Sequence, residues 1–254
     1  MLIDLELKIF APLFIPLFMK KFFLFFTILL LVLACAKEEK NTTITGDVRG
    51  LKKGTLYLEK FDDSLMVTID SLVMSGSSAF SFKLNLESPE VLYLFLRKTD
   101  GINIEDGIEF FAEPGIITIN TTLNDFEANA QISGSVNHDK YMEYQRLMQR
   151  YRDRSLEFYV ENIEAERDGD EAKKIEINQK YESLIKSRYV ATINFAINHK
   201  EYEVAPYLAL SEIFDANVKY LDTIYKALTP EVQNSTYGRQ LENYIKERQI
   251  LESN

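Results

Sequence analysis

The sequence has one cysteine, Cys35, no tryptophan and two histidines among its 254 residues. A single cysteine excludes an intramolecular disulfide, a thiol redox pair and a cysteine-ligated zinc site. Neither His138 nor His199 has an aspartate or histidine partner at metal-ligand spacing. We expect His138 at a helix start and His199 near a helix end, both in surface or capping roles, with no metal and no cofactor.

Motifs that hold phosphate or build a hydrolase nucleophile elbow are also absent, so nothing in the sequence favours an enzyme. Acidic residues do gather at Glu105-Asp106, Glu109 and Glu113. The Asp-x-Asp-x-Asp-Gly pattern of a calcium loop is missing, and we expect a solvated loop there. Asp168-Gly169-Asp170 is predicted to be a turn for the same reason.

Basic residues are scarce. Without the three lysines and two acidic residues of positions 1–34, the chain carries 26 Lys+Arg and 37 Asp+Glu, a net charge of −11. Binding nucleic acid requires clustered Lys and Arg, and so does a polybasic contact with anionic lipid. Neither nucleic acid nor a polybasic lipid contact is therefore expected.

Long apolar runs are confined to the first 34 residues. Lys20-Lys21 precede the apolar stretch Phe22–Leu33, whose length of about a dozen residues suits a signal peptide and not the ~20 of a membrane span. Val32, Leu33 and Ala34 before Cys35 resemble the bacterial lipoprotein box. We predict a signal peptide over residues 1–34 and lipidation of Cys35, whose acyl chains would hold the chain on a membrane.

Residues 1–18 fit poorly before this leader, because they contain Asp4, Glu6 and two prolines. We interpret them as an upstream start that is not used, with Met19 as the start; a first membrane segment is the alternative. Residues 35–41 form a lipidated tether, in which Lys37-Glu38-Glu39 resembles the surface-export signal of Bacteroidota lipoproteins. The prediction is an outer membrane lipoprotein that faces either the periplasm or the outside.

Residues 42–135 have the pattern of short strands. Thr55–Phe61 and Phe80–Leu84 alternate at period two, whereas Val91–Leu96 is apolar on both faces and suits a central strand. Turn residues such as Pro114-Gly115 separate these runs. We predict an antiparallel β-sandwich or open barrel.

Residues 136–254 change to the three-and-four spacing of helices. The turn at Gly169 would join the two longest helices into a hairpin. The final helix starts at Thr229-Pro230 or at Ser235. The expected helices span residues 139–167, 171–199, 204–214, 218–228 and 229 or 235 to the end. The fold class is thus α+β, with a β module followed by an α-helical region.

Several tyrosines recur at helical spacing, which favours packing between the helices or onto the sheet, although a ligand-stacking role stays open. They are Tyr141, Tyr144, Tyr151, Tyr159, Tyr181 and Tyr189. Ile177 and Leu184 share the expected inward face.

Several short motifs, taken in their order along the sequence, resemble one protein family. Asp70-Ser71 with Gly76 and Phe80-Ser81-Phe82 is similar to its "D-S…G…F-x-F" run, Phe110–Gly115 to its "F-hydrophobic-E-P-G" pair, and Ile132–Ser135 to its closing "hydrophobic-x-G-S". The family is a Bacteroidota lipoprotein domain of unknown function that precedes AhpC/TSA (TlpA-type) thioredoxin-like domains. The resemblance covers most of residues 42–247. It does not extend to the family's thiol chemistry, because no cysteine follows Cys35.

The expected function is therefore a lipid-anchored cell-envelope protein with a non-catalytic binding or assembly role. Its partners would be the membrane, through the lipid anchor, and an unidentified envelope protein. Two alternatives remain. One is a truncated relative or accessory partner of a thioredoxin-like disulfide reductase, and the other is a carbohydrate- or peptide-binding lipoprotein.

Overall fold

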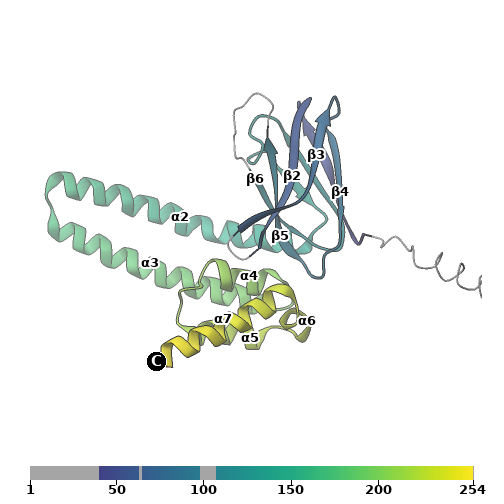
Figure 1. The fold of residues 1–254 in the computed structure, drawn as a ribbon. Helices are drawn as coiled ribbons and strands as arrows, with labels where there is room; N and C mark the ends of the chain where they lie inside the picture. Colours follow the sequence, from purple (N-terminus) through teal and green to yellow (C-terminus); the bar gives the residue numbers. More distant parts are fainter. Residues whose placement is uncertain (1–39, 63–64, 98–106, 254) are drawn as a thin grey trace, which may run out of the picture. The chain divides into compact units, whose positions relative to one another are not determined.

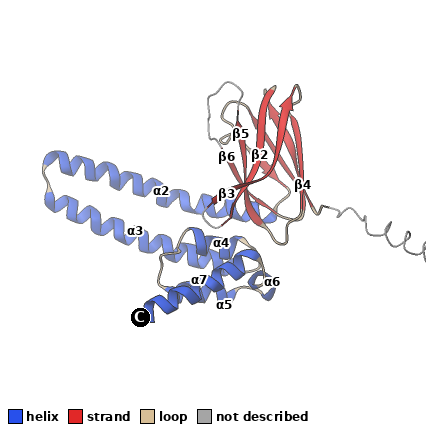
Figure 2. Cartoon of the chain, in the orientation of Figure 1, coloured by secondary structure: helices blue, strands red, loops and turns tan. Residues whose placement is uncertain are grey.

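A computed structural model describes residues 40–62, 65–97 and 107–253 (Figure 1). Its strands are β1 (Thr42–Arg49), β2 (Lys53–Asp62), β3 (Leu65–Ser75), β4 (Ala79–Leu84), β5 (Glu90–Arg97), β6 (Gly107–Ala112), β7 (Gly115–Thr122) and β8 (Gln131–Ser133). Its helices are α2 (Val136–Asp168), α3 (Glu171–Asn198), α4 (Val204–Ser211), α5 (Val218–Ala227), α6 (Pro230–Gln233) and α7 (Thr236–Ser253). The predicted β module followed by a helical region is confirmed (Figure 2).

The strands form two four-stranded sheets, in the orders β4-β1-β7-β8 and β3-β2-β5-β6. Their inward side chains make one apolar cluster that includes Ile44 and Ile117 from the first sheet and Leu56, Leu94 and Phe110 from the second. These five residues are fully buried, as expected for alternating strands that turn one face to a shared core. The two sheets therefore pack face to face as a sandwich that is not closed into a barrel.

One strand pair departs from the expected antiparallel arrangement. β1 and β7 run parallel over their whole length, from the Thr42–Gly115 pair to the Arg49–Thr122 pair. A Cβ added to Gly46 would lie 1.7 Å from the carbonyl oxygen of Ile119. The glycine thus allows this close approach, which no side chain could accommodate at that position.

The two long helices form the predicted hairpin. Ser135 caps the start of α2 by accepting a hydrogen bond from the His138 amide, and Gly169 ends the helix in the left-handed conformation. Asp170 then caps α3 by accepting from the Lys173 amide. The predicted turn at these residues is confirmed.

The end of the helical region contains both of the predicted helix starts. Thr229 caps the short α6, with Pro230 at its first position. The Ser235 hydroxyl then accepts a hydrogen bond from the Gly238 amide in the first turn of α7. A Cβ on Gly238 would lie 2.0 Å from the Val232 carbonyl oxygen, so α7 starts tightly against the end of α6.

Helices cover one end of the outer face of the β3-β2-β5-β6 sheet. Val91 of β5 and Phe111 of β6 are buried against α2, α3 and α4, in a cluster that includes Tyr144, Phe195 and Leu208. The sandwich and the helical region therefore share a core and belong to one compact unit, Lys40–Asn254. Within the described ranges, no helix is both long enough and apolar enough to cross a membrane.

Candidate functional site

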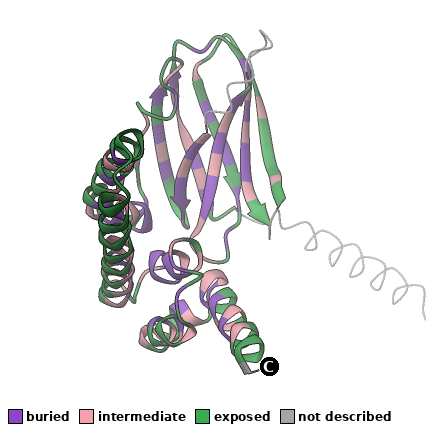
Figure 3. Ribbon diagram, turned by 90° about the vertical axis from the view of Figure 1, so that its left-hand side faces the viewer, coloured by how far each residue is buried: buried purple, intermediate pink, exposed green. Residues whose placement is uncertain are grey.

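The outer face of the β3-β2-β5-β6 sheet is open beyond the helices. Strand register places Tyr57 beside Phe95, and Glu59 beside Tyr93, on this face. Phe61 is 53% exposed, and Tyr57, Tyr93 and Phe95 are partly exposed. Buried residues alternate with partly buried and exposed ones along the strands of the sandwich (Figure 3). We call the surface formed by Tyr57, Phe61, Tyr93 and Phe95 the aromatic face.

Three of the four rings of the aromatic face form a continuous row of contacts. Phe61 meets Tyr93 edge-on with ring centroids 5.5 Å apart, and Tyr93 stacks on Phe95 at 6.0 Å. Phe95 in turn lies over Gly107, where an added Cβ would come within 2.2 Å of its ring. Ring contacts of this kind add stability beyond the buried area and fix ring orientation. The aromatic face is therefore preorganised.

A short polar row crosses the aromatic face. The Glu59 carboxylate is 6% exposed and accepts a hydrogen bond from the Thr68 hydroxyl at 2.9 Å. Arg97 lies 3.7 Å from this carboxylate, and its guanidinium is 4.3 Å from the centroid of the Tyr57 ring. Aromatic surface around a few convergent polar groups is the usual composition of a binding site.

A second group of tyrosines joins this face to the helices. The Glu109 carboxylate accepts hydrogen bonds from the hydroxyls of Tyr141 at 3.1 Å and Tyr207 at 3.0 Å. The Tyr237 ring packs against the Tyr207 ring, and its hydroxyl oxygen accepts a hydrogen bond from the Val91 amide at 2.9 Å. These contacts link α2, α4 and α7 to β5 and β6.

Burial and the Glu109 charge hold the tyrosine hydroxyls of this junction in their neutral form. Burial, together with the nearby Glu109 carboxylate, raises the pKa of Tyr93 to about 12. The same two causes raise the pKa of Tyr207 further. The hydroxyls thus stay protonated throughout the physiological range and can donate hydrogen bonds.

The prediction of a solvated acidic loop is wrong for Glu109 and Glu113, the two of its acidic residues that the structure describes. Glu109 receives two tyrosine hydroxyls, as above. Glu113 accepts the backbone amide of Val136 at 2.8 Å and both the amide and the side-chain nitrogen of Asn137. The partners of both residues come from distant elements, which a local excess of charge does not reveal. Glu105 and Asp106 lie outside the described residues.

The two histidines differ in environment. His138 is 5% exposed, which contradicts the expected surface role, and its Nδ1 atom has no hydrogen-bond partner. Burial lowers the pKa of its imidazole. His199 follows α3 as its capping residue and stacks on Phe195 with centroids 4.0 Å apart, in agreement with the expected capping position.

The helical tyrosines divide along the hairpin. Tyr144 and Tyr151 are buried, and Tyr141 and Tyr189 are partly buried, as expected for packing. Tyr159 is 65% exposed and Tyr181 is 44% exposed, so the packing predicted for these two tyrosines is wrong. Ile177 is buried and Leu184 is partly buried, as expected.

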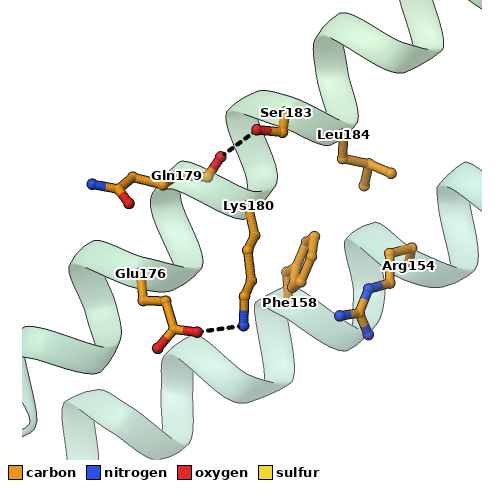
Figure 4. Close-up of a pocket in the computed structure, with 7 residues that line it drawn as sticks. All are labelled: Arg154, Phe158, Glu176, Gln179, Lys180, Ser183 and Leu184. Atoms are coloured by element: carbon orange, nitrogen blue, oxygen red, sulfur yellow. Dashed lines mark hydrogen bonds and ion pairs between the residues drawn. The ribbon is translucent and has the colours of Figure 1, made fainter.

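A shallow hollow between α2 and α3 offers no comparable set of free polar groups (Figure 4). The Arg154 guanidinium lies 4.2 Å from the centroid of the Phe158 ring and pairs with Glu157. Lys180 pairs with Glu176 at 2.6 Å. The hollow is lined by Arg154, Phe158, Glu176, Gln179, Lys180, Ser183 and Leu184. The charges around it already have partners on their own helices.

Within the described ranges, no three His, Cys, Asp or Glu side chains gather in a group that could hold a metal ion. Cys35, the predicted lipidation site, lies outside those ranges together with the whole predicted signal peptide.

Comparison with protein families gives one match. Residues 42–141, which span the sandwich and the start of α2, match the model of a domain of unknown function, DUF4369. Searches of curated proteins and of solved structures gave no match. The predicted resemblance to a domain of unknown function is therefore supported over the β module.

Proposed function

We propose that this protein is a lipid-anchored binding module of the bacterial cell envelope with no catalytic role, which engages an envelope protein through its aromatic face. The observation that carries the proposal is the half-covered outer sheet. The helices bury Val91 of β5 and Phe111 of β6, while Phe61 on the neighbouring strand β2 stays 53% exposed. Exposed aromatic surface of this kind typically marks a contact site.

The leader supports the envelope location. A signal peptide over residues 1–34 would leave Cys35 as the lipidated first residue of an outer membrane lipoprotein. A Cys35→Ala variant should move from the membrane fraction to the soluble fraction, because the acyl chains would be lost. Equal partitioning of variant and wild type would refute the anchor.

The class of partner follows from the resemblance described above. Lipoproteins with this domain carry a thioredoxin-like domain, so a separate thioredoxin-like envelope protein is the first partner to test. The chain itself should show no activity in an insulin-reduction assay, since the sequence holds no cysteine pair. Thiol-dependent activity of the purified protein would overturn the non-catalytic assignment.

The binding surface can be tested with a photo-crosslinking amino acid placed at one position at a time in intact cells. We expect a specific adduct from position 61 and none from position 182, because Glu182 is exposed within α3 and does not belong to the sheet that carries the aromatic face. Tyr57→Ala should reduce the yield at position 61 if the adduct reports real binding. Equal yields from both positions would count against the aromatic face, and adducts with polysaccharide would favour carbohydrate binding instead.

A further inference from the structure

Glu203 is a buried carboxyl group that the proposed binding surface does not use. It directly precedes α4 and is 5% exposed. Its Oε2 atom lies 2.6 Å from the hydroxyl oxygen of Ser235, which is 7% exposed at the start of α7. The carboxyl group therefore sits where α4, α6 and α7 converge.

The hydrogen bonds around Ser235 determine the protonation state of Glu203. The Ser235 oxygen also lies 2.7 Å from the Val232 carbonyl oxygen and accepts the Gly238 amide at 3.1 Å. A serine hydroxyl has one hydrogen to donate and two lone pairs to accept with. If Glu203 were ionised, its oxygen and the Val232 carbonyl would compete for that one hydrogen, and the Val232 carbonyl would keep only the Ser235 amide at 3.2 Å whenever the hydroxyl donated to Glu203.

A protonated Glu203 places one hydrogen in each of the three contacts of the Ser235 oxygen. Its own hydrogen is donated to Ser235, the Ser235 hydrogen is donated to the Val232 carbonyl, and the Gly238 amide fills the remaining lone pair. An ionised Glu203 would leave a buried acceptor facing another acceptor at hydrogen-bond distance, which is strongly unfavourable.

We propose that Glu203, Ser235 and Val232 form a proton-dependent clasp, which holds the start of α7 against α4 while Glu203 keeps its proton and loosens when Glu203 ionises. This device is independent of the proposed function. The proton involved comes from solvent and returns to it, so the equilibrium needs no other reactant.

Burial opposes ionisation of Glu203. Burial is the main cause, with Glu231 of α6, of a Glu203 pKa raised to about 7, and a hydrogen bond from the Ser235 hydroxyl to the carboxylate acts in the opposite direction. Arg239 of α7 also lowers the pKa, but its guanidinium is 56% exposed and lies 3.7 Å from Glu87. From α2, the uncharged side chain of Asn137 accepts the amide of Val204, the residue after Glu203, at 3.2 Å.

The raised pKa of Glu203 determines how the stability of the clasp changes with pH. A carboxyl group that binds its proton more tightly in the folded state stabilises the fold below its unfolded pKa, near 4.5. This stabilisation is lost as the pH rises through about 7. The opening equilibrium of the clasp should therefore increase by up to about tenfold per pH unit between roughly pH 5 and 7 and then level off.

Hydrogen exchange tests the clasp in the full chain. After correction for the intrinsic rates, the amides of Gly238 and Arg239 should exchange at least tenfold faster at pH 8 than at pH 5 in the wild type. Glu203→Gln keeps the shape and can donate from its amide, so its protection should not change with pH. Exchange in the wild type that follows the same pH profile as in this variant would overturn the proposal.

A carbon-13 titration of the Glu203 carboxyl group in the wild-type protein provides a test without any variant. A midpoint near 7 supports the clasp. A midpoint in the ordinary glutamate range, near 4.5, would overturn it even if Glu203→Gln failed to fold.

Discussion

Glu113, in the turn between β6 and β7, caps the first turn of α2 through Asn137, which lies 24 residues later in the chain. One carboxylate oxygen accepts the Val136 amide, and the other accepts two groups of Asn137. The side-chain oxygen of Asn137 then accepts the Val204 amide at the start of α4. A turn of the sandwich is thus connected to two helices through one asparagine.

We expect Glu113→Ala to lower the free energy of unfolding by about 1–3 kcal/mol, because three donors at a helix start would lose a charged acceptor. Urea denaturation measures the change. Glu182→Ala, at an exposed position within α3, is the matched control and should change stability by less than about 0.5 kcal/mol. Equal effects of the two substitutions would show that the capping contact contributes nothing.

The Glu109 junction should respond unequally to substitutions of its members. Tyr207→Phe removes one hydroxyl donor and should cost about 1 kcal/mol, whereas Glu109→Ala leaves two hydroxyls without their acceptor and should cost about 2–4 kcal/mol. The two changes should not add in the double variant, since they remove the same hydrogen bond. Tyr220→Phe, at an exposed position of α5, is the control. Simple additivity would indicate that Glu109 and Tyr207 do not interact.

His138 should make the protein sensitive to mild acid. Burial lowers the pKa of its imidazole, so the unfolded chain takes up a proton near pH 6.5 that the folded chain resists. Stability from this group is therefore complete above about pH 6.5 and is lost as the pH falls below it.

A His138→Leu variant removes both the titration and the unpaired Nδ1 atom. Its free energy of unfolding should be within about 1 kcal/mol of wild type at pH 7 and should exceed wild type at pH 5. The opposite trend that Glu203 contributes is present in both proteins and cancels in the comparison. A constant difference between the two proteins across this range would contradict the buried neutral imidazole.

Gly46→Ala should severely destabilise the sandwich, by about 3 kcal/mol or more, because the new methyl group would collide with the backbone carbonyl of Ile119. Gly76→Ala is the contrasting variant. Its φ of 83° strains any other residue, but nothing lies within 4 Å of an added Cβ, so about 1–2 kcal/mol is expected. Thermal unfolding should rank the two variants in this order. Equal losses would mean that β1 and β7 can move apart at little cost.

The spacing of apolar residues predicted the strands and helices, because these elements depend on residues that are close together in the sequence. The alternation in Phe80–Leu84 and the three-and-four spacing after Ser135 come from side-chain directions along the chain, which the sequence contains. The parallel pairing of β1 with β7 depends on strands about 70 residues apart, which periodicity does not encode. The only local indication of this pairing is Gly46, because a glycine inside an alternating strand often marks a close approach of another backbone.

The candidate site was less accessible to prediction for the same reason. Glu109 is 98 residues from Tyr207, so its acceptor role cannot be read from neighbouring residues. The misjudged packing of Tyr159 has a different cause. Helical spacing indicates which residues share a face, but it does not indicate where along α2 that face stops having a partner.

If the chain is anchored at Cys35, as proposed above, the position of β1 has a mechanical consequence. β1 lies between β4 and β7. Asn41, just before it, exchanges hydrogen bonds with Leu86, and its carbonyl oxygen accepts a hydrogen bond from the Gly115 amide. A pull on the preceding residues, directed along the strand, loads two rows of backbone hydrogen bonds simultaneously in shear. Shear requires these bonds to break together, whereas an edge strand would unzip them one at a time. The sandwich is therefore built to resist tension at the end nearest Cys35.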